Sequence, residues 1–190
     1  MTEAELIELK KLARSNTYHA HGDPQTADCV IAFSFGYVQQ GEKVLPGKSN
    51  QQLASFIEER FSTIPVIAQF EIGTALQKIS ATYAITTHYI PGKYLDSGEV
   101  ARQAHEYMVA HSWQRAIIVT HPALEARNDY ACSSIGIVTI APLGLETIEY
   151  DIFSAQSWTR NAKDWWTREE GVIDLCYKND WLRLPSDLAH

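Results

Sequence analysis

Two side chains that could bind an anion, His121 and Arg127, follow the β-branched apolar run at 116–120. Pro122 suits the first position of a helix, where its missing N–H costs nothing. The sequence therefore predicts a strand followed directly by a helix, with Thr120 or His121 as the N-cap. Free N–H groups at a helix start attract anions, and the side chain of Arg127 leans back toward that end. A phosphate or carboxylate would fit this arrangement.

An ordinary structural role explains the same stretch. His121 would then only cap the helix, and Arg127 would be a surface residue paired with Glu125 or Asp129. Both explanations stay open from the sequence.

Four further candidate ligand contacts lie at the ends of predicted strands and helices: Ser34, Gly36, Glu71 and Glu99. Ser34 and Gly36 end the first apolar run, where a glycine permits close approach of a ligand and equally suits a plain turn. Glu71 begins a predicted helix, where the helix dipole favours a carboxylate with or without a ligand. Glu99 comes three residues after Asp96, which is the spacing of a capping box. The chain has neither GxGxxG nor a P-loop, so both phosphate fingerprints are absent from the sequence.

A second kind of chemistry is suggested by the segment YHAHGDP. His19, His21 and Asp23 alternate there, and H-x-H-x-D occurs in some binuclear metal hydrolases. Such sites need further His and Asp ligands downstream, and His88, His105 and His111 lack a recognisable spacing for that role. A solvated polar loop is the alternative, and the sequence favours it.

Composition limits the classes of function. The 190 residues are 45% hydrophobic, enough for one domain with a sizeable core. A net charge of −7 and a pI of about 5.5 leave no basic surface for nucleic acid. No run approaches the roughly 18 apolar residues of a membrane span, and the N-terminus lacks a signal-peptide core, so we expect a cytoplasmic protein. The three cysteines are far apart in apolar runs, as expected of small buried side chains: Cys29, Cys132 and Cys176.

Strand and helix patterns alternate along the chain, which predicts an α/β fold with a mostly parallel sheet of about five strands. The expected strands are 29–35, 64–70, 83–90, 116–120 and 135–142, and residues 36–48 are expected to form a loop. The expected helices are 3–14, 49–61, 71–79, 96–113, a helix from 122, and 167–179. Capping-box spacings mark three helix starts: Ser49 with Gln52, Asp96 with Glu99, and Thr167 with Glu170.

Ligands of open α/β sheets bind beyond the carboxyl ends of the strands. The loops after the predicted strands therefore predict one site, formed by Ser34, Gly36, Glu71, Thr120, His121 and Arg127. We expect a single domain over 1–190, with an N-terminal helix and loop at 1–27 and an aromatic helical segment at 152–190. The aromatic residues of this tail would pin it onto the domain or form a self-association surface: Trp158, Trp165, Trp166, Tyr177 and Trp181.

The order of these segments resembles the YdcF-like family, which includes SanA and ElyC. The resemblance covers about 28–182: an Asp-led strand, then PGKSNQQLA, IPVIAQFE, DSGEVARQA, AIIVTHPALEAR and TREEGVIDLCYKNDWL. It implies a Rossmann-like three-layer α/β/α fold. It also implies a crevice for nucleotide-like ligands, with S-adenosylmethionine among the candidates.

The match to the family motif V-T-S-x-x-H-x-x-R is partial. Val119, Thr120 and Arg127 agree with it, whereas His121 takes the Ser place and Leu124 the His place. The family's S-G-G after the second strand is replaced by Gln69, Phe70 and Glu71, and Val100 stands near the Asn place of T-x-E-N. The resemblance thus implies a divergent member in which Arg127 is the firmest site residue.

Three functions follow as hypotheses. The first is a protein that binds a nucleotide-like or other anionic small molecule at the carboxyl edge of the sheet, with the reaction undefined. The second is a metal-dependent hydrolase that uses His19, His21 and Asp23. The third is a non-catalytic interaction protein whose aromatic tail supports a homo-oligomer.

Overall fold

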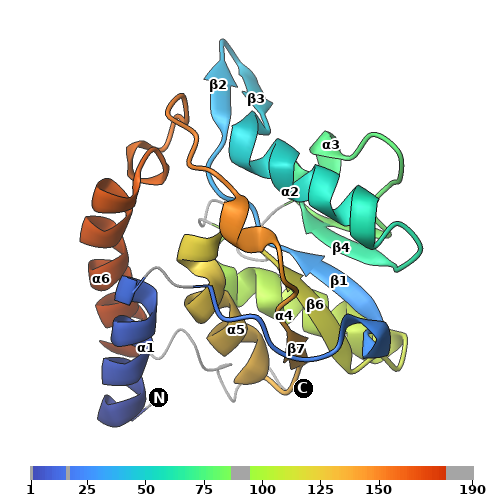
Figure 1. Ribbon diagram of the computed structural model, residues 1–190, viewed down its shortest axis with the longest axis horizontal. Helices are drawn as coiled ribbons and strands as arrows, with labels where there is room; N and C mark the ends of the chain where they lie inside the picture. Colours follow the sequence, from blue (N-terminus) through green and yellow to red (C-terminus); the bar gives the residue numbers. More distant parts are fainter. Residues whose placement is uncertain (1, 16–17, 87–94, 179–190) are drawn as a thin grey trace.

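The computed structural model describes residues 2–15, 18–86 and 95–178, which form an α/β fold around a five-stranded sheet (Figure 1). The strands are β1 (Cys29–Ala32), β4 (Val66–Gln69), β5 (Tyr83–Ile85), β6 (Arg115–Val119) and β7 (Val138–Ile140). They lie in the order β5-β4-β1-β6-β7, and every neighbouring pair is parallel. The predicted sheet is thereby confirmed. Since the chain builds outward in both directions from β1, the topological switch point lies between β1 and β6.

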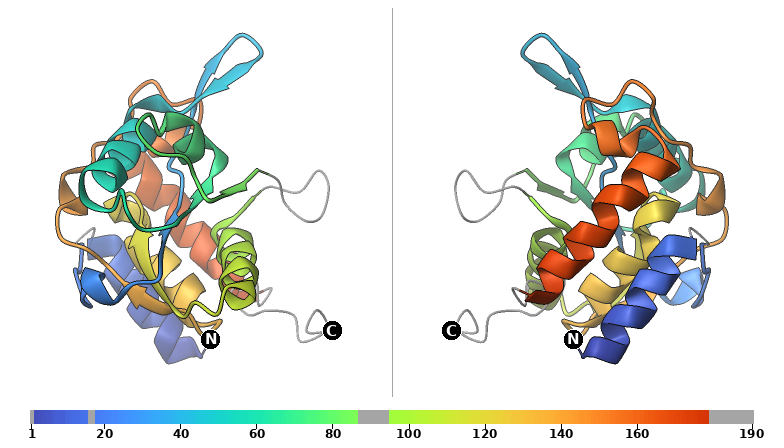
Figure 2. Two further views of the ribbon diagram at one scale, coloured as in Figure 1. Left: turned by 90° about the vertical axis from the view of Figure 1, so that its right-hand side faces the viewer. Right: turned by 90° about the vertical axis from the view of Figure 1, so that its left-hand side faces the viewer.

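Helices cover both faces of the sheet, as the three-layer prediction requires. One face carries α2 (Gly47–Arg60) and α3 (Phe70–Ala75), and the other carries α4 (Ser97–Ala110) and α5 (Glu125–Ser133). Outside α5 lie α1 (Glu3–Ser15) and α6 (Ala162–Lys178), which contact each other (Figure 2, right). Short 3-10 turns complete the described elements: η1 (Pro24–Thr26), η2 (Pro122–Leu124), η3 (Leu145–Thr147) and η4 (Ser157–Thr159).

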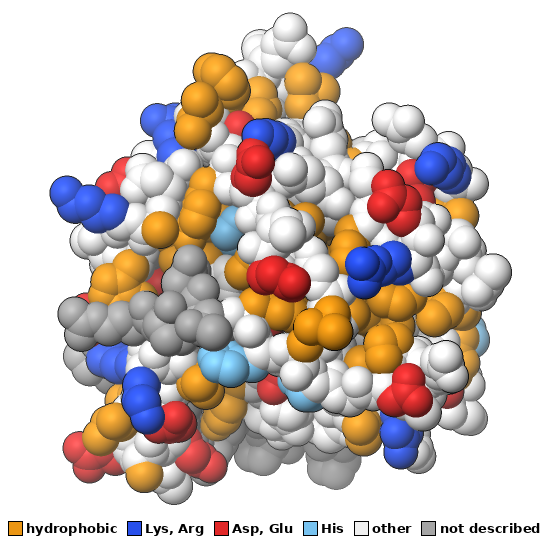
Figure 3. Space-filling view, in the orientation of Figure 1, with side chains coloured by type: hydrophobic (Ala, Val, Ile, Leu, Met, Phe, Trp, Pro, Cys, Tyr) orange, Lys and Arg blue, Asp and Glu red, His pale blue; other side chains and the backbone are white. Residues whose placement is uncertain are grey.

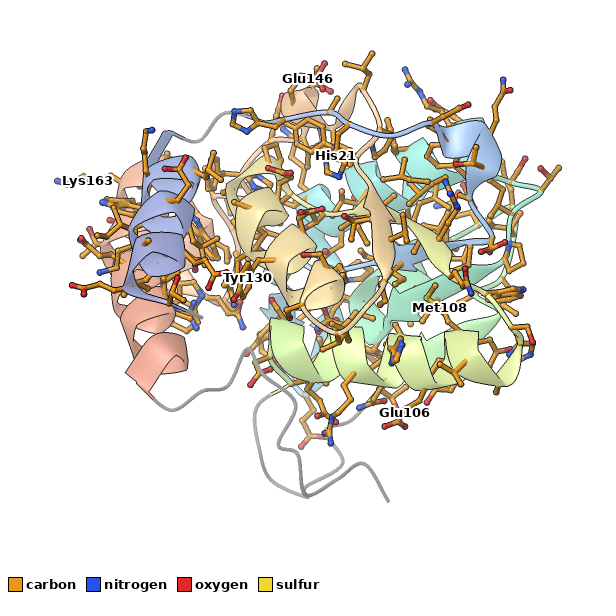
Figure 4. The ribbon with its side chains drawn as sticks, turned by 90° about the horizontal axis from the view of Figure 1, so that it is seen from below. His21, Glu106, Met108, Tyr130, Glu146 and Lys163 are labelled. Carbon is orange, nitrogen blue, oxygen red and sulfur yellow. The ribbon has the colours of Figure 1, made fainter. Side chains whose placement is uncertain are left out.

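The central strands β1, β4 and β6 are buried on both faces of the sheet, which explains their continuous apolar runs. On β1, Ile31 faces the α4 and α5 side, whereas Val30 and Ala32 face α2. On α4, Met108 is buried and points toward the sheet, while Glu106 is exposed and points away (Figure 4). Within the described residues, no helix has the length and apolar character that a membrane crossing needs.

The first strand is shorter than predicted because side chains replace its ladder partners. β1 ends at Ala32 instead of 35. The N–H of Ser34 donates to the side-chain oxygen of Gln69 at 2.9 Å, and that of Phe35 donates to Asn50 at 2.8 Å. Other elements are also shorter than predicted. α3 ends at Ala75 instead of 79, and β7 covers only the middle of the predicted 135–142. β5 ends at Ile85, and the predicted strand residues 87–90 lie outside the described residues.

A two-stranded antiparallel hairpin occupies part of the segment predicted to be a loop. It consists of β2 (Val38–Gln40) and β3 (Lys43–Leu45) and projects from the body of the fold (Figure 1). Its residues are largely exposed, so they lack the apolar alternation by which a half-buried strand is recognised.

Two predicted helix starts are wrong because other residues cap the helices. α2 begins at Gly47, where the carboxylate of Asp151 accepts from the N–H of Lys48 at 2.7 Å, so Ser49 lies inside the helix. α6 begins at Ala162 instead of 167, and Thr167 also lies inside its helix. Before α6, Asn161 accepts from the N–H of Asp164 at 3.0 Å, and its amide donates to the Asp164 carboxylate.

The predicted cap of α4 is confirmed. The carboxylate of Asp96 accepts from the N–H of Glu99 at 2.9 Å.

Candidate functional site

His121 leaves the carboxyl end of β6 and caps the turn that follows. Its Nδ1 accepts from the N–H of Ala123 at 3.2 Å, and its ring stacks on Phe35 with 3.9 Å between ring centroids. Only 1% of the residue is exposed, and this burial lowers the pKa of His121 to about 3. The imidazole is therefore neutral at physiological pH.

An aromatic cluster lies at the switch point between β1 and β6. This switch-point cluster consists of Phe35, His121, Tyr150 and Trp165. Trp165 comes from α6, lies 4.9 Å from Phe35 between ring centroids, and donates its indole N–H to the carbonyl of Ala123 at 3.1 Å. The place where an open α/β sheet usually takes its ligand is thus lined with rings from the C-terminal segment.

Arg127 borders the same cluster and forms a buried ion pair. Its Nε lies 2.6 Å from Oε1 of Glu169 on α6, and its guanidinium carbon lies 5.9 Å from the centroid of the Trp165 ring. The side chain of Arg127 is 9% exposed, and that of Glu169 is not exposed at all. Burial raises the pKa of Glu169, and the positive charge of Arg127 opposes that rise.

The pair leaves polar atoms without partners. Within the described part of the chain, neither terminal Nη group of Arg127 makes a hydrogen bond, and Oε2 of Glu169 has no partner. A guanidinium has five N–H donors, so most of its hydrogen-bonding capacity remains uncommitted.

The remaining predicted contacts are satisfied by neighbouring groups. The hydroxyl of Ser34 donates to the carboxylate of Glu71 at 2.8 Å. The hydroxyl of Thr120 accepts from the amide of Asn128 at 2.8 Å in the interior. Ser34 and Glu71 therefore tie the ends of β1 and α3 together, whereas Thr120 anchors α5.

Gly36 gives room to the chain itself. Its φ is +71°, and a Cβ at this position would lie 2.5 Å from the hydroxyl oxygen of Thr159 and 2.6 Å from that of Ser154. The close approach that the sequence predicts is made by the segment before α6.

Glu99 is buried at the start of α4 and forms an ion pair with Arg102, and its carboxylate also accepts from the amide of Gln103 at 2.9 Å. Described contacts thus join His121 to Arg127 through the switch-point cluster, and they also join Ser34 to Glu71 and Glu99 to Arg102.

The residues of the predicted metal motif have different partners. Asp23 caps η1 by accepting from the N–H of Gln25 at 3.0 Å. His21 lies beside β7 (Figure 4), where its Nε2 is 3.3 Å from Oδ1 of Asp129, and backbone hydrogen bonds link it to residue 141. Among the described residues, no group of three or more His, Cys, Asp or Glu side chains is placed to hold a metal ion.

The other histidine of the motif, His19, contacts an acid on α5. Its Nδ1 lies 4.0 Å from Oε2 of Glu125, whose side chain is almost fully buried. Burial, together with the charge of Asp129, raises the pKa of Glu125 to about 7.

The aromatic tail contributes to the interior. Trp165 is 4% exposed, and the Trp158 ring lies under the guanidinium of Arg168 at 4.5 Å. Trp166 packs against the core on the α4 and α5 side. Trp181 lies outside the described residues, and the side chain of Tyr177 is not described either.

Three residues of the site were not predicted as site residues: Phe35, Tyr150 and Glu169. Trp165, Glu169 and Ile173 are spaced four residues apart and all are buried, so this periodicity could have placed Glu169 on the inner face of a helix that begins earlier. Tyr150 lies in an irregular segment without any period that would identify it.

On the face shown in Figure 3, acidic and basic side chains are interspersed, with no continuous basic patch. Comparison of the chain with family models, curated proteins and solved structures found no match.

Proposed function

We propose that the protein binds a small anionic metabolite at the carboxyl edge of the sheet, with Arg127 contacting its anionic group. The observation that carries the proposal is an arginine with a side chain only 9% exposed, whose terminal Nη groups reach the surface and have no hydrogen bond within the described chain. Donors that reach the surface are open to a ligand from solution, and an arginine fork matches the oxygens of carboxylates and phosphates.

The surroundings of Arg127 suit a ligand that also has a flat apolar part. The switch-point cluster lies directly beside the guanidinium, and aromatic rings favour stacked or edge-on contact with other rings. Nucleotide-like molecules combine both features, in agreement with the resemblance to the YdcF-like family. S-adenosylmethionine is a candidate through its carboxylate and adenine, and we place the ligand among cytoplasmic metabolites.

A thermal-shift screen tests this proposal. The probes are S-adenosylmethionine, adenosine monophosphate, glucose 6-phosphate and divalent metal salts. A ligand at about a hundred times its Kd contributes about 2.7 kcal/mol, and we expect a rise in Tm of about 5–10 °C for one of the anionic probes.

The variant to compare is the double substitution Arg127→Gln with Glu169→Gln, which removes both charges and avoids leaving a buried carboxylate alone. It should lose the ligand-induced rise in Tm. A matched control, Glu59→Gln with Arg60→Gln, removes an exposed acid and a neighbouring arginine from α2 and should keep that rise. Absence of a rise with all anionic probes, or an undiminished rise in the Arg127/Glu169 variant, would refute the proposal.

A further inference from the structure

The hydrogen bond that caps η2 fixes the position of the proton on His121. A ring nitrogen that accepts a hydrogen bond carries no proton, and Nδ1 accepts from the N–H of Ala123. The proton of the neutral ring therefore lies on Nε2. This Nε2–H is a buried donor, and within the described residues it has no acceptor.

Tyr150 offers a second donor in contact with the first. Its ring meets the His121 ring edge-on, with 4.5 Å between centroids and 61° between planes. Its hydroxyl is also buried without a partner among the described residues. Burial raises the pKa of Tyr150 to about 12, so the O–H keeps its proton.

Both rings belong to the cluster that Arg127 borders. Phe35 stacks on His121 and contacts Tyr150 and Trp165, and the guanidinium of Arg127 lies over Trp165. Two neutral donors and a partly uncommitted cation thus belong to one group of contacting side chains. A buried donor without an acceptor is destabilising, and a bound acceptor would remove that destabilisation.

We propose that His121 Nε2–H and Tyr150 O–H form a neutral donor pair that binds oxygens of the ligand's carboxylate or phosphoryl group. The inference rests on the proposed function and adds two contacts to it. Either group presents two or three oxygens, so one ligand group can serve both donors together with Arg127. His121 is then a hydrogen-bond donor and has no lone pair available at Nε2 to act as a general base.

Titration with inorganic phosphate and with acetate tests the donor pair. Tyr150→Phe removes only the hydroxyl, and Tyr83→Phe on β5 makes the same change away from the switch point. Loss of one hydrogen bond to a charged group should weaken binding about tenfold or more in Tyr150→Phe, and Tyr83→Phe should bind like the wild type. In 15N NMR of the histidine rings, His121 should show a protonated Nε2, and this signal should shift when the anion is added.

The outcomes separate the two proposals. If Tyr150→Phe binds as the wild type does while the Arg127/Glu169 double variant has lost binding, the donor pair is wrong and the proposed function stands. A proton on Nδ1 of His121, or a wild-type protein that binds neither phosphate nor acetate, also overturns the donor pair. The proposed function itself fails only by its own screen with the larger ligands.

Discussion

At the scale of single residues, the candidate site consists of buried polar groups, some of which stabilise the folded protein while others destabilise it. The charge of Arg127 stabilises the carboxylate of Glu169, whereas the interior disfavours both charges. His121 avoids that cost by staying neutral.

Removing one partner of the buried pair should be costly. In Arg127→Ala, the carboxylate of Glu169 stays buried without its cation, and we expect a loss of about 3–5 kcal/mol in the free energy of unfolding at pH 7. When the pKa of a carboxyl such as that of Glu169 is higher in the folded than in the unfolded protein, the protonated carboxyl stabilises the fold. This stabilisation is present below the unfolded-state pKa and is lost as the pH rises through the folded-state pKa. The deficit should therefore shrink when urea unfolding is repeated at pH 5.

Adding Glu169→Gln to Arg127→Ala is the control, because it removes the unpaired charge and should recover part of the loss. Equal stability of wild type and Arg127→Ala at pH 7 would contradict this account of the pair.

Glu125 should make the stability of the wild type depend on pH. Its pKa is raised from 4.5 to about 7, so the stability that it contributes below pH 4.5 is lost as the pH rises through 7. Glu125→Gln lacks this loss. Relative to the wild type, the variant should gain about 2 kcal/mol between pH 5 and pH 8, measured by urea unfolding. Glu59→Gln, an exposed change on α2, should show no such gain. If the stability of Glu125→Gln depends on pH as that of the wild type does, the proposed effect of burial on Glu125 is wrong.

The sequence could predict which residues are near the edge but could not predict their partners. The cap formed by His121 follows from its place between a strand and Pro122. The expected partners of Arg127, Glu125 or Asp129, are near it in sequence, whereas the actual partner is Glu169 on another helix. Contacts between residues far apart in the chain depend on packing, which local patterns do not encode.

At the scale of elements, the C-terminal segment is packed into the end of β1. Gly36 permits this packing in two ways, since it adopts a positive φ and leaves space for Ser154 and Thr159. The bond from the Ala155 N–H to the carbonyl of Tyr37, at 2.7 Å, joins the same two segments.

Two glycines with similar backbone conformation allow the packing effect to be measured. Gly36 has a φ of +71° and close neighbours, while Gly41 has a φ of +60° and nothing within 4 Å of its added Cβ. Gly41→Ala should cost about 1 kcal/mol for the backbone alone. Gly36→Ala should cost about 1–3 kcal/mol more because of overpacking. Urea unfolding measures both, and equal losses would show that the segment before α6 yields without strain.

Predictability differed among elements for a physical reason. The buried central strands β1, β4 and β6 are continuous apolar runs, and such runs identify them without tertiary information. The exposed β2–β3 hairpin has no buried face, and the starts of α2 and α6 depend on Asp151 and Asn161. Asp151 is about a hundred positions from α2, so no local pattern could reveal that cap.

At the scale of the whole molecule, two thiols report on the core. Cys29 lies on the central strand and Cys132 on α5, and both are free and fully buried. Burial raises the pKa of Cys29 to about 12 and raises that of Cys132 as well, so neither forms a reactive thiolate.

Labelling of these thiols should therefore require global unfolding. Both thiols are labelled with iodoacetamide in increasing concentrations of urea. The free energy that protects each thiol from labelling should equal the free energy of unfolding measured by circular dichroism. Peptide mass spectrometry assigns the label to each cysteine. Labelling of Cys29 at the rate of a small thiol in native buffer would show that the sheet opens locally.

The alternation of strands and helices was sufficient to predict the class of fold and the parallel sheet. It was not sufficient to predict which rings lie at the switch point, because they come from segments far apart in the chain. Two of them precede β7 in the sequence and two follow it: Phe35 and His121, then Tyr150 and Trp165.

This distribution along the chain has a consequence for synthesis on the ribosome. The sheet is complete once Ile140 has emerged, but Tyr150, Trp165 and Glu169 follow later. A nascent chain can thus form the whole sheet while the switch point is still open to water and Arg127 still lacks its acid. The Arg127–Glu169 pair and the switch-point cluster are then completed after the sheet, when α6 packs, so translation itself sets the order in which the sheet and the candidate site arise.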